Sequence, residues 1–245
     1  MRLLSRSLWL GIAVLSFVVS AQAQQAPVQQ PPERVIINFI VPVTPDSVNQ
    51  LMSVVNAQVR NGTKKITIVI SSSGGDPNAG FAAYNFLRNV QAEITTFNGG
   101  AVDSAALLIY CGGKYRYSLP DPSRFLIHPT ALNPMTTSVN VESRWLESQL
   151  AQLKSFDQVM TQVIMANSTK KQSEIENAIR IQTILSPEDA KQWGLVQDIR
   201  PSYMEAGAVF VGVNVPPEKE QKQTPSPYTS DGPSISSGNV KKLTP

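Results

Sequence analysis

The sequence predicts an α/β fold built around a mostly parallel sheet. Two stretches rich in β-branched residues, 34–41 and 65–70, have the pattern of buried strands. Each is followed by a segment whose apolar residues recur at helical spacing, 47–60 and 78–89. Strands that alternate with helices are typical of βαβ units, in which the strands run parallel. In such sheets the functional sites lie at the carboxyl ends of the strands.

Residues 1–23 have the pattern of a signal peptide. Arg2 and Arg6 give a positive start, and the apolar run 8–19 is too short to span a bilayer comfortably. Ala21-Gln22-Ala23 is a small-x-small cleavage site. We therefore expect cleavage after Ala23 and export to the periplasm or beyond, with an uncleaved membrane anchor as the alternative. Residues 24–33 are polar and contain three prolines, which indicates a flexible lead-in.

In the first half of the domain, capping residues, proline and glycine indicate where helices begin and end and where turns lie. Thr44-Pro45-Asp46 is typical of a helix start, and Asn61-Gly62 of a helix end. The second strand is followed by the pair Gly74-Gly75, which leads into the second helix. A third strand, 94–97, precedes another glycine-rich turn at 98–100. Both turns are expected at carboxyl ends of strands, where a site would form.

The segment after the second turn carries the residues best suited to catalysis. Ser104 stands at the start of an apolar helical run, and the short strand 124–127 ends in His128, the only histidine of the chain. A serine at such a junction can attack a carbonyl while nearby N–H groups stabilise the oxyanion. Histidine is the usual base for it. The alternative is that Asp103 and Ser104 merely cap a helix and that His128 is structural.

The second half of the chain is predicted to be helical and then irregular. Residues 141–166 form a long helix that protrudes and could serve assembly, and two shorter helices follow, beginning at Ser173 and near Ser186. A short strand is expected at 194–199. The α/β domain thus covers 34–200. The tail, 201–245, is rich in proline and polar residues and is expected to be largely disordered, with one extra strand at 208–215.

The composition argues against several functions. With 42% hydrophobic and 16% charged residues, the chain can bury a core. The leader holds two of the 21 basic residues and no acid, so the mature chain carries 19 basic and 18 acidic residues, a net charge of +1. This balance argues against nucleic acid as a partner. One cysteine, Cys111, and one histidine exclude a zinc site of the usual composition, and we expect no cofactor.

Four blocks of residues together form a specific pattern. They are Ile70 to Gly75 with Ala79, Gly80 and Tyr84; Gly100 to Ala106; Arg116, Leu119, Pro120 and Ser123 to Pro129; and Leu185 to Ala190 with Trp193 to Val196. In this order and spacing, over roughly residues 34–199, the chain resembles the proteolytic subunit of the Clp protease and its ClpP-like relatives in the ClpP/crotonase superfamily. The Val102-Asp103-Ser104 form resembles an exported, divergent branch of that family.

The resemblance implies a ClpP/crotonase-like spiral of βαβ units with a protruding long helix, and a serine hydrolase that acts on peptide bonds. It implies Ser104 as the nucleophile and His128 as the general base. It also implies that the N–H groups of Gly75 and Ala105 form the oxyanion hole. The spacing from Ser104 to His128 is one residue shorter than is usual in the Clp subunit, so the correspondence at Ser104 requires a gap.

The third position of the implied catalytic triad departs from the family. The family's aspartate lies four residues before the serine of the Leu-Ser-Pro block, and counting back from Ser186 gives Gln182. An acid at that position orients the histidine and stabilises its protonated form. Gln182 can accept a hydrogen bond but supplies no charge. Slow hydrolysis by a dyad, an acid from elsewhere and an inactive enzyme all stay open.

Three functions fit these observations. The first is a ClpP-like serine peptidase with peptide or protein substrates, which we expect to form a homo-oligomer. Because export separates it from ATP and cytosolic unfoldases, we expect no ATPase partner. The second is a weakly active or inactive scaffold or peptide-binding protein with the same fold, which Gln182 favours. The third is a crotonase-like acyl-CoA enzyme, which export disfavours because acyl-CoA is intracellular.

Overall fold

The computed structural model describes residues 32–131 and 142–213. The signal peptide expected at 1–23, nearly all of the lead-in, most of the loop after His128 and most of the tail lie outside these ranges. Within them, no helix is long and apolar enough to cross a membrane.

The described residues form eight strands and six helices. In chain order they are β1 (Arg34–Phe39), α1 (Pro45–Arg60), β2 (Lys65–Ser72), α2 (Pro77–Asn89), β3 (Glu93–Asp103), α3 (Ala106–Cys111), β4 (Tyr115–Ser118), β5 (Arg124–Ile127), α4 (Ser143–Ala166), α5 (Gln172–Arg180), β6 (Thr183–Leu185), α6 (Pro187–Gln192), β7 (Asp198–Ile199) and β8 (Val209–Gly212). Strands and helices alternate over the first half, as the sequence pattern predicts.

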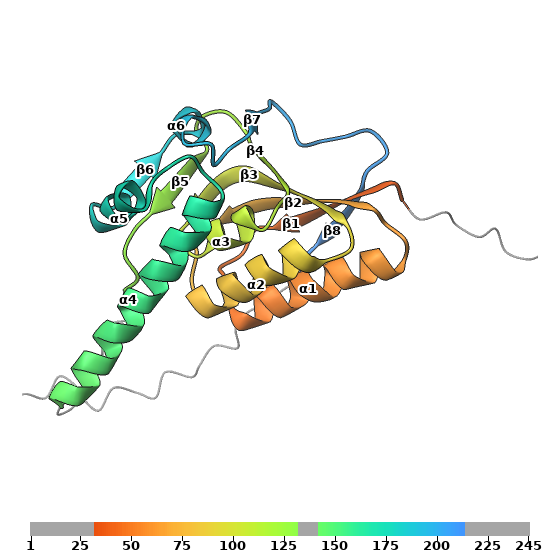
Figure 1. Cartoon of the computed structure of the whole chain (residues 1–245). Coiled ribbons are helices and arrows are strands. Elements are labelled where there is room, and N and C mark those ends of the chain that lie inside the picture. Colours follow the sequence, from red (N-terminus) through yellow and green to blue (C-terminus); the bar gives the residue numbers. More distant parts are fainter. Residues whose placement is uncertain (1–31, 132–141, 214–245) are drawn as a thin grey trace, which may run out of the picture. The chain divides into compact units, whose positions relative to one another are not determined.

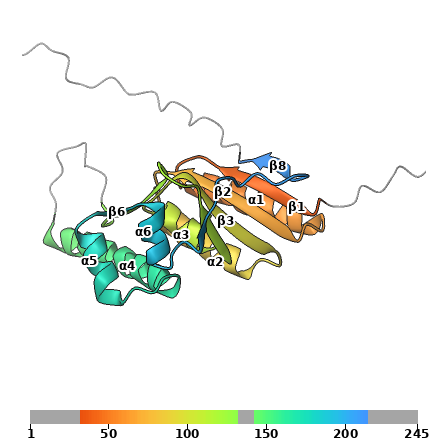
Figure 2. The ribbon, with the colours of Figure 1, turned by 90° about the horizontal axis from the view of Figure 1, so that it is seen from above.

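All the strands belong to one sheet, which branches at β3. The main order is β6-β5-β3-β2-β1-β8, and every pair is parallel except β5 with β6. The first part of β3 also pairs with β4, whereas its last residues, 101–103, pair with β5. Strand β8 lies at one end of this order, beside β1, and β6 lies at the other (Figures 1 and 2). This is the mixed α/β architecture that the sequence predicts.

Local sequence explains where the main helices begin. The Thr44 hydroxyl accepts from the Ser47 N–H at 3.1 Å, and the Ser47 hydroxyl accepts from the Thr44 N–H at 2.9 Å, so α1 starts with a reciprocal capping box. Asp76 caps α2 by accepting from the Ala79 N–H at 3.0 Å. Ser186 and Asp189 cap α6 in the same reciprocal way as α1. These caps fix the ends of helices at positions that the sequence marks.

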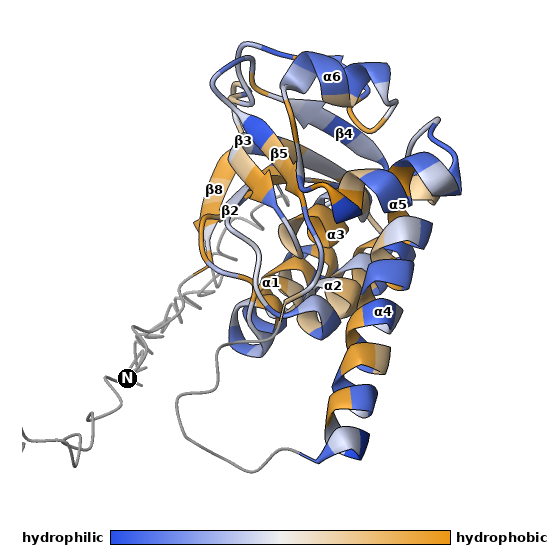
Figure 3. Ribbon diagram, turned by 90° about the vertical axis from the view of Figure 1, so that its left-hand side faces the viewer, coloured by the Kyte–Doolittle hydropathy of each residue, from blue (hydrophilic) through white to orange (hydrophobic). Residues whose placement is uncertain are grey.

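Helix α4 extends beyond the sheet (Figure 1). Its last turns are anchored, because Val163 and Ile164 are buried in the core. Its first turns are not, and hydrophobic residues recur along them (Figure 3). Trp145, Leu146 and Leu150 are 39%, 54% and 52% exposed.

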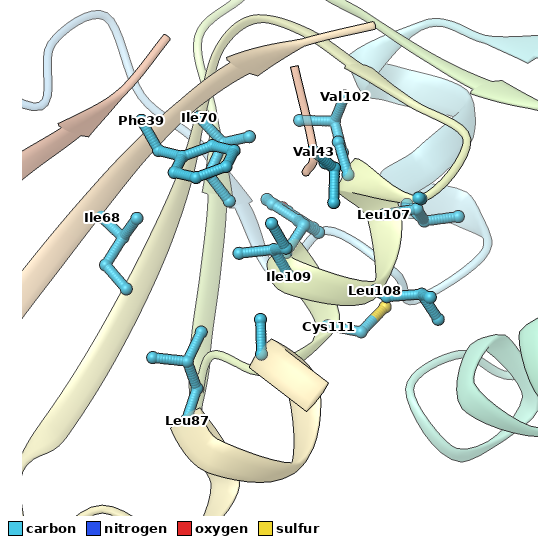
Figure 4. Packing of buried hydrophobic residues seen from close by; sticks show 14 of the residues in the cluster. Phe39, Val43, Ile68, Ile70, Leu87, Val102, Leu107, Leu108, Ile109 and Cys111 are labelled. Atoms are coloured by element: carbon cyan, nitrogen blue, oxygen red, sulfur yellow. The ribbon is translucent and has the colours of Figure 1, made fainter. Parts of the chain in front are cut away.

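The main core packs residues of the sheet against helices α1, α2 and α3, and Figure 4 shows part of this packing. Alternate residues of each strand face it, for example Phe39 in β1 and Ile68 and Ile70 in β2. Burying side chains of this size stabilises the fold by about 1.5–3 kcal/mol each. The opposite face of the sheet has a smaller cluster, in which Phe97 packs edge-on against Tyr117 and Tyr203.

The prediction of a glycine-rich turn at 98–100 is wrong. These residues belong to β3, which continues to Asp103. A Cβ on Gly99 would stand 2.7 Å from the Val69 side chain, and one on Gly100 would stand 3.0 Å from the Ser71 hydroxyl. The two glycines therefore let β2 and β3 lie close together where their register shifts, between Ile70 and Ser72.

The short strand β4 was not predicted, and tertiary contacts explain its presence. Four residues of mixed polarity carry little strand signal on their own. In the structure β4 pairs with β3, and the buried Arg116 guanidinium donates to the carbonyls of Leu195 and Asn167 at 2.9 and 3.2 Å. These bonds connect β4 to the end of α4 and to the segment after α6.

Candidate active site

Ser104 lies in a tight turn between β3 and α3. Its φ angle is +55°, a left-handed conformation that non-glycine residues rarely adopt. Two hydrogen bonds hold it there: the Ser104 N–H donates to the Leu126 carbonyl at 2.8 Å, and its carbonyl accepts from the Leu107 N–H at 2.9 Å. Strained positions of this kind cluster at functional sites.

The alternative that Asp103 and Ser104 only cap a helix is wrong. Helix α3 begins after Ala105 and has no side-chain cap. The Asp103 carboxylate is buried and instead accepts from the Arg124 guanidinium of β5 at 2.8 Å. Asp103 therefore connects the neighbouring strands β3 and β5 at the residue before the serine.

The Gly74-Gly75 turn lies directly against the serine turn. Both glycines have positive φ, +86° and +145°. A Cβ on Gly74 would stand 2.7 Å from the Ser104 Cβ and 3.0 Å from the Ala105 nitrogen. A Cβ on Gly75 would stand 2.2 Å from the Val43 carbonyl oxygen. Only glycine fits at either position, so the approach of the two turns depends on this pair.

Two backbone N–H groups next to Ser104 have no hydrogen-bond acceptor among the described residues, those of Gly75 and Ala105. For Gly75 the reason is the bridge to Val43, whose N–H and carbonyl bond to Gly74 and Asp76, the residues on either side. In a parallel bridge the intervening N–H then points away from the partner strand. An oxyanion hole needs free donors of this kind.

His128 follows directly after β5. Its Nδ1 lies 2.7 Å from the carbonyl oxygen of Pro129. Because a carbonyl can only accept, Nδ1 must carry the proton, and Nε2 of the neutral ring is left as the acceptor. A histidine that takes a proton from a serine needs this tautomer.

Ser104, His128, Gly75 and Ala105 all line one cavity of about 450 Å³. The described residues show no hydrogen bond between Ser104 and His128, and such bonds are often long before a substrate binds. Apolar side chains supply much of the remaining wall: Pro77, Phe81, Leu108, Phe156, Val159 and Met160. The structure thus brings four of the five expected site residues to one cavity.

Gln182 is the one expected site residue that does not line this cavity. It precedes β6, and the pairing of Ile127 with Thr183 places Gln182 across from His128 just beyond the ladder. Its φ is +57°, and the residue is exposed. Its side chain makes no hydrogen bond within the described part of the chain.

Two groups near His128 were not anticipated from the sequence, the Pro129 carbonyl and the Asp157 carboxylate of α4. The Thr130 N–H donates to Asp157 Oδ1 at 2.8 Å. No spacing rule connects residues 27 positions apart in a loop and a helix, so only the folded chain shows this contact. Among the described residues there is also no group of three or more His, Cys, Asp or Glu side chains that could hold a metal ion.

The branched sheet and the strained serine define a class of protein, the ClpP-like α/β fold. The structure matches an asparagine-to-aspartate mutant of ClpP1 from Listeria monocytogenes with a TM-score of 0.61, covering 70% of this chain and 93% of that one. The sequence identity of that pair is 20%, so the match describes the fold alone.

The chain belongs to the Clp protease family, whose model matches residues 22–202. It is 33% identical over 138 residues to the ATP-dependent Clp protease proteolytic subunit 2 of Borreliella burgdorferi, covering 56% of this chain and 67% of the relative. It is 28% identical to the corresponding subunit of Bdellovibrio bacteriovorus, with 58% and 66% covered, and 29% identical to subunit 1 of Cutibacterium acnes, with 68% and 77% covered. The resemblance is thus confirmed, and it supports a ClpP-like peptidase.

Proposed function

We propose that this chain is a serine peptidase that hydrolyses peptide bonds, with Ser104 as nucleophile and His128 as general base. The observation that carries the proposal is the meeting of four groups at one cavity: the serine, the histidine, and the N–H groups of Gly75 and Ala105, which have no acceptor among the described residues. Each has a role that the others require, which makes a coincidental arrangement a poor explanation.

The chemistry follows from the tautomer of His128. Nε2 accepts the Ser104 proton while Oγ bonds to the substrate carbonyl carbon, and the resulting oxyanion accepts from the two N–H groups. The imidazolium then gives the proton to the leaving amine as the C–N bond breaks. A water molecule, activated in the same way, hydrolyses the acyl-enzyme and frees Ser104. The apolar wall formed by Phe81, Phe156 and Met160 fits an apolar side chain beside the scissile bond.

We also propose that the protein acts as a homo-oligomer. The exposed apolar residues on the first turns of α4, Trp145, Leu146 and Leu150, support this proposal, because a row of large hydrophobic side chains on a protruding helix is costly in water. The pattern of residues 1–23 supports export. Because export separates an enzyme from the ATP of the cytosol, we propose that this protein works without an ATPase partner.

A fluorophosphonate probe tests the catalytic proposal. We expect the mature protein to be labelled, and we expect Ser104→Ala and His128→Ala each to lower the labelling rate by at least about 10³-fold. Ser53→Ala is the matched control, since Ser53 is an exposed serine on α1 and should leave labelling unchanged. A folded native protein that stays unlabelled over a wide pH range would contradict the proposal and favour the non-catalytic scaffold.

A further inference from the structure

In a catalytic triad, the acid accepts a hydrogen bond from the Nδ1–H of the histidine. Here the Nδ1–H of His128 donates to the Pro129 carbonyl, and Gln182 does not accept it. We infer that Asp157 is the positioning acid of this site, acting on His128 through the peptide unit between Pro129 and Thr130. The inference rests on the proposed function, because it concerns the same histidine. Asp157 does not touch the substrate in this scheme.

Two hydrogen bonds carry the inference, and they meet on one peptide group. The Pro129 carbonyl accepts from His128 Nδ1 at 2.7 Å, and the Thr130 N–H donates to Asp157 Oδ1 at 2.8 Å. That carbonyl and that N–H belong to the same planar, resonance-stabilised amide. The chain of contacts is therefore imidazole, amide, carboxylate, with no gap.

An amide in this position lets the Asp157 carboxylate polarise the Pro129 carbonyl oxygen. A carboxylate that accepts from the N–H draws the amide toward its polar resonance form, which places more negative charge on the carbonyl oxygen. Hydrogen bonds in series strengthen one another in this way. The Pro129 oxygen thereby becomes a better acceptor for Nδ1–H, which fixes the tautomer and the ring orientation. It also stabilises the imidazolium that forms when Nε2 takes the Ser104 proton.

The surroundings of Asp157 leave its charge available for this role. The residue is half-buried on α4 and lines a cavity of about 300 Å³ together with Pro129. Glu176 and Arg180 of α5 line the same cavity. The ion pairs found in the described residues do not include Asp157. Its helix is held by Val163 and Ile164, so the carboxylate is attached to a fixed element.

Because His128 is the only histidine, nuclear magnetic resonance of its ring gives an unambiguous test. In the native protein we expect ring nitrogen shifts of the Nδ1–H tautomer and a hydrogen-bonded Nδ1–H proton resonance. Asp157→Asn keeps an oxygen that can accept from Thr130 but removes the charge. We expect this variant to shift the Nδ1–H resonance upfield and to lower the fluorophosphonate labelling rate by about 10-fold, far less than the ~10⁴-fold loss when a directly bonded acid is replaced.

Glu176→Gln is the matched control, because it removes a carboxylate from the same cavity, and the Glu176 carboxylate bonds to Gln172, while the Thr130 N–H bonds to Asp157. We expect it to leave both readouts unchanged. Unchanged readouts in folded Asp157→Asn would overturn the inference, and so would a shift of the resonance in Gln182→Ala alone. If the native protein is not labelled at all, the proposed function fails, while the resonance still shows whether Asp157 acts on His128.

Discussion

The backbone of Ser104 shows what the serine turn requires. A left-handed φ at a non-glycine residue costs on the order of 1–3 kcal/mol, and the bonds to Leu126 and Leu107 hold the residue there. The left-handed conformation ends β3 before Ser104 and places the serine next to the Gly74 turn. Gly74 and Gly75 are equally constrained, because any side chain would meet backbone atoms. The position of Ser104, the proposed nucleophile, is thus determined by a few backbone conformations.

At the same scale, Cys111 is expected to be unreactive. It is fully buried in α3, and burial raises the pKa of its thiol to about 12. The thiolate is the reactive form, so it should be almost absent at pH 8. We expect no reaction of the native protein with a disulfide reagent at pH 8, and one thiol per chain after unfolding in guanidinium. Rapid modification of the native protein would contradict this burial.

Helix α4 contributes to the molecule in two different ways along its length. Its last turns pack into the core through Val163 and Ile164. Before them along the helix, Met160 lines the cavity of Ser104, and Asp157 accepts from the Thr130 N–H. Its first turns carry exposed apolar residues beyond the sheet (Figure 3). If Asp157 positions His128 and the first turns of α4 form the contact between copies, as proposed above, this helix connects assembly with the geometry of the site.

We expect the double variant Leu146→Ser with Leu150→Ser to weaken self-association. Each leucine is about half exposed and would contribute about 1–2 kcal/mol if buried in an interface. Light scattering coupled to size exclusion should show smaller species than for the native protein. Glu147→Ser with Ala151→Ser changes the same helix at the same spacing and should leave the mass unchanged. Equal masses for the native protein and the leucine variant would count against α4 as the contact surface.

On the scale of the whole molecule, the sheet connects distant parts of the sequence to one site. Strand β2 brings the glycine pair, β3 the serine and β5 the histidine, and all three are adjacent and parallel. Their carboxyl ends therefore meet at one edge, as expected for this class of fold. The segment after β7 continues to β8 at the opposite end of the sheet, where it pairs with β1 (Figure 1).

The pattern of residues 1–23 predicts where the protein is located and where its chain is cut. We expect export with cleavage after Ala23, so that N-terminal sequencing of the mature protein begins at Gln24. Intact mass should fall by the mass of residues 1–23. Ala23→Arg, which places a large charged residue at the cleavage position, should leave the precursor uncut. A native protein that keeps Met1 after export would instead favour a membrane anchor.

The sequence by itself determined the elements whose signal is local. Helix α1 and strand β2 follow from side-chain periodicity and capping residues, and the four blocks of motif residues identify the family and point to Ser104 and His128. The spacing of apolar residues matches the geometry of a helix or a strand over a few neighbouring positions, so this pattern can be recognised in the sequence alone.

Only the tertiary structure decided the remaining features. Gly99 and Gly100 belong to β3, where the absence of a side chain lets β2 lie close. Strand β4 is held by its pairing with β3 and by the hydrogen bonds of Arg116 to backbone carbonyls. The contact of Asp157 with Thr130 joins a helix to a loop. Each of these depends on atoms brought together by folding from distant positions. A single chain carries no local pattern for such contacts, because the free energy that selects them comes from the packed molecule as a whole.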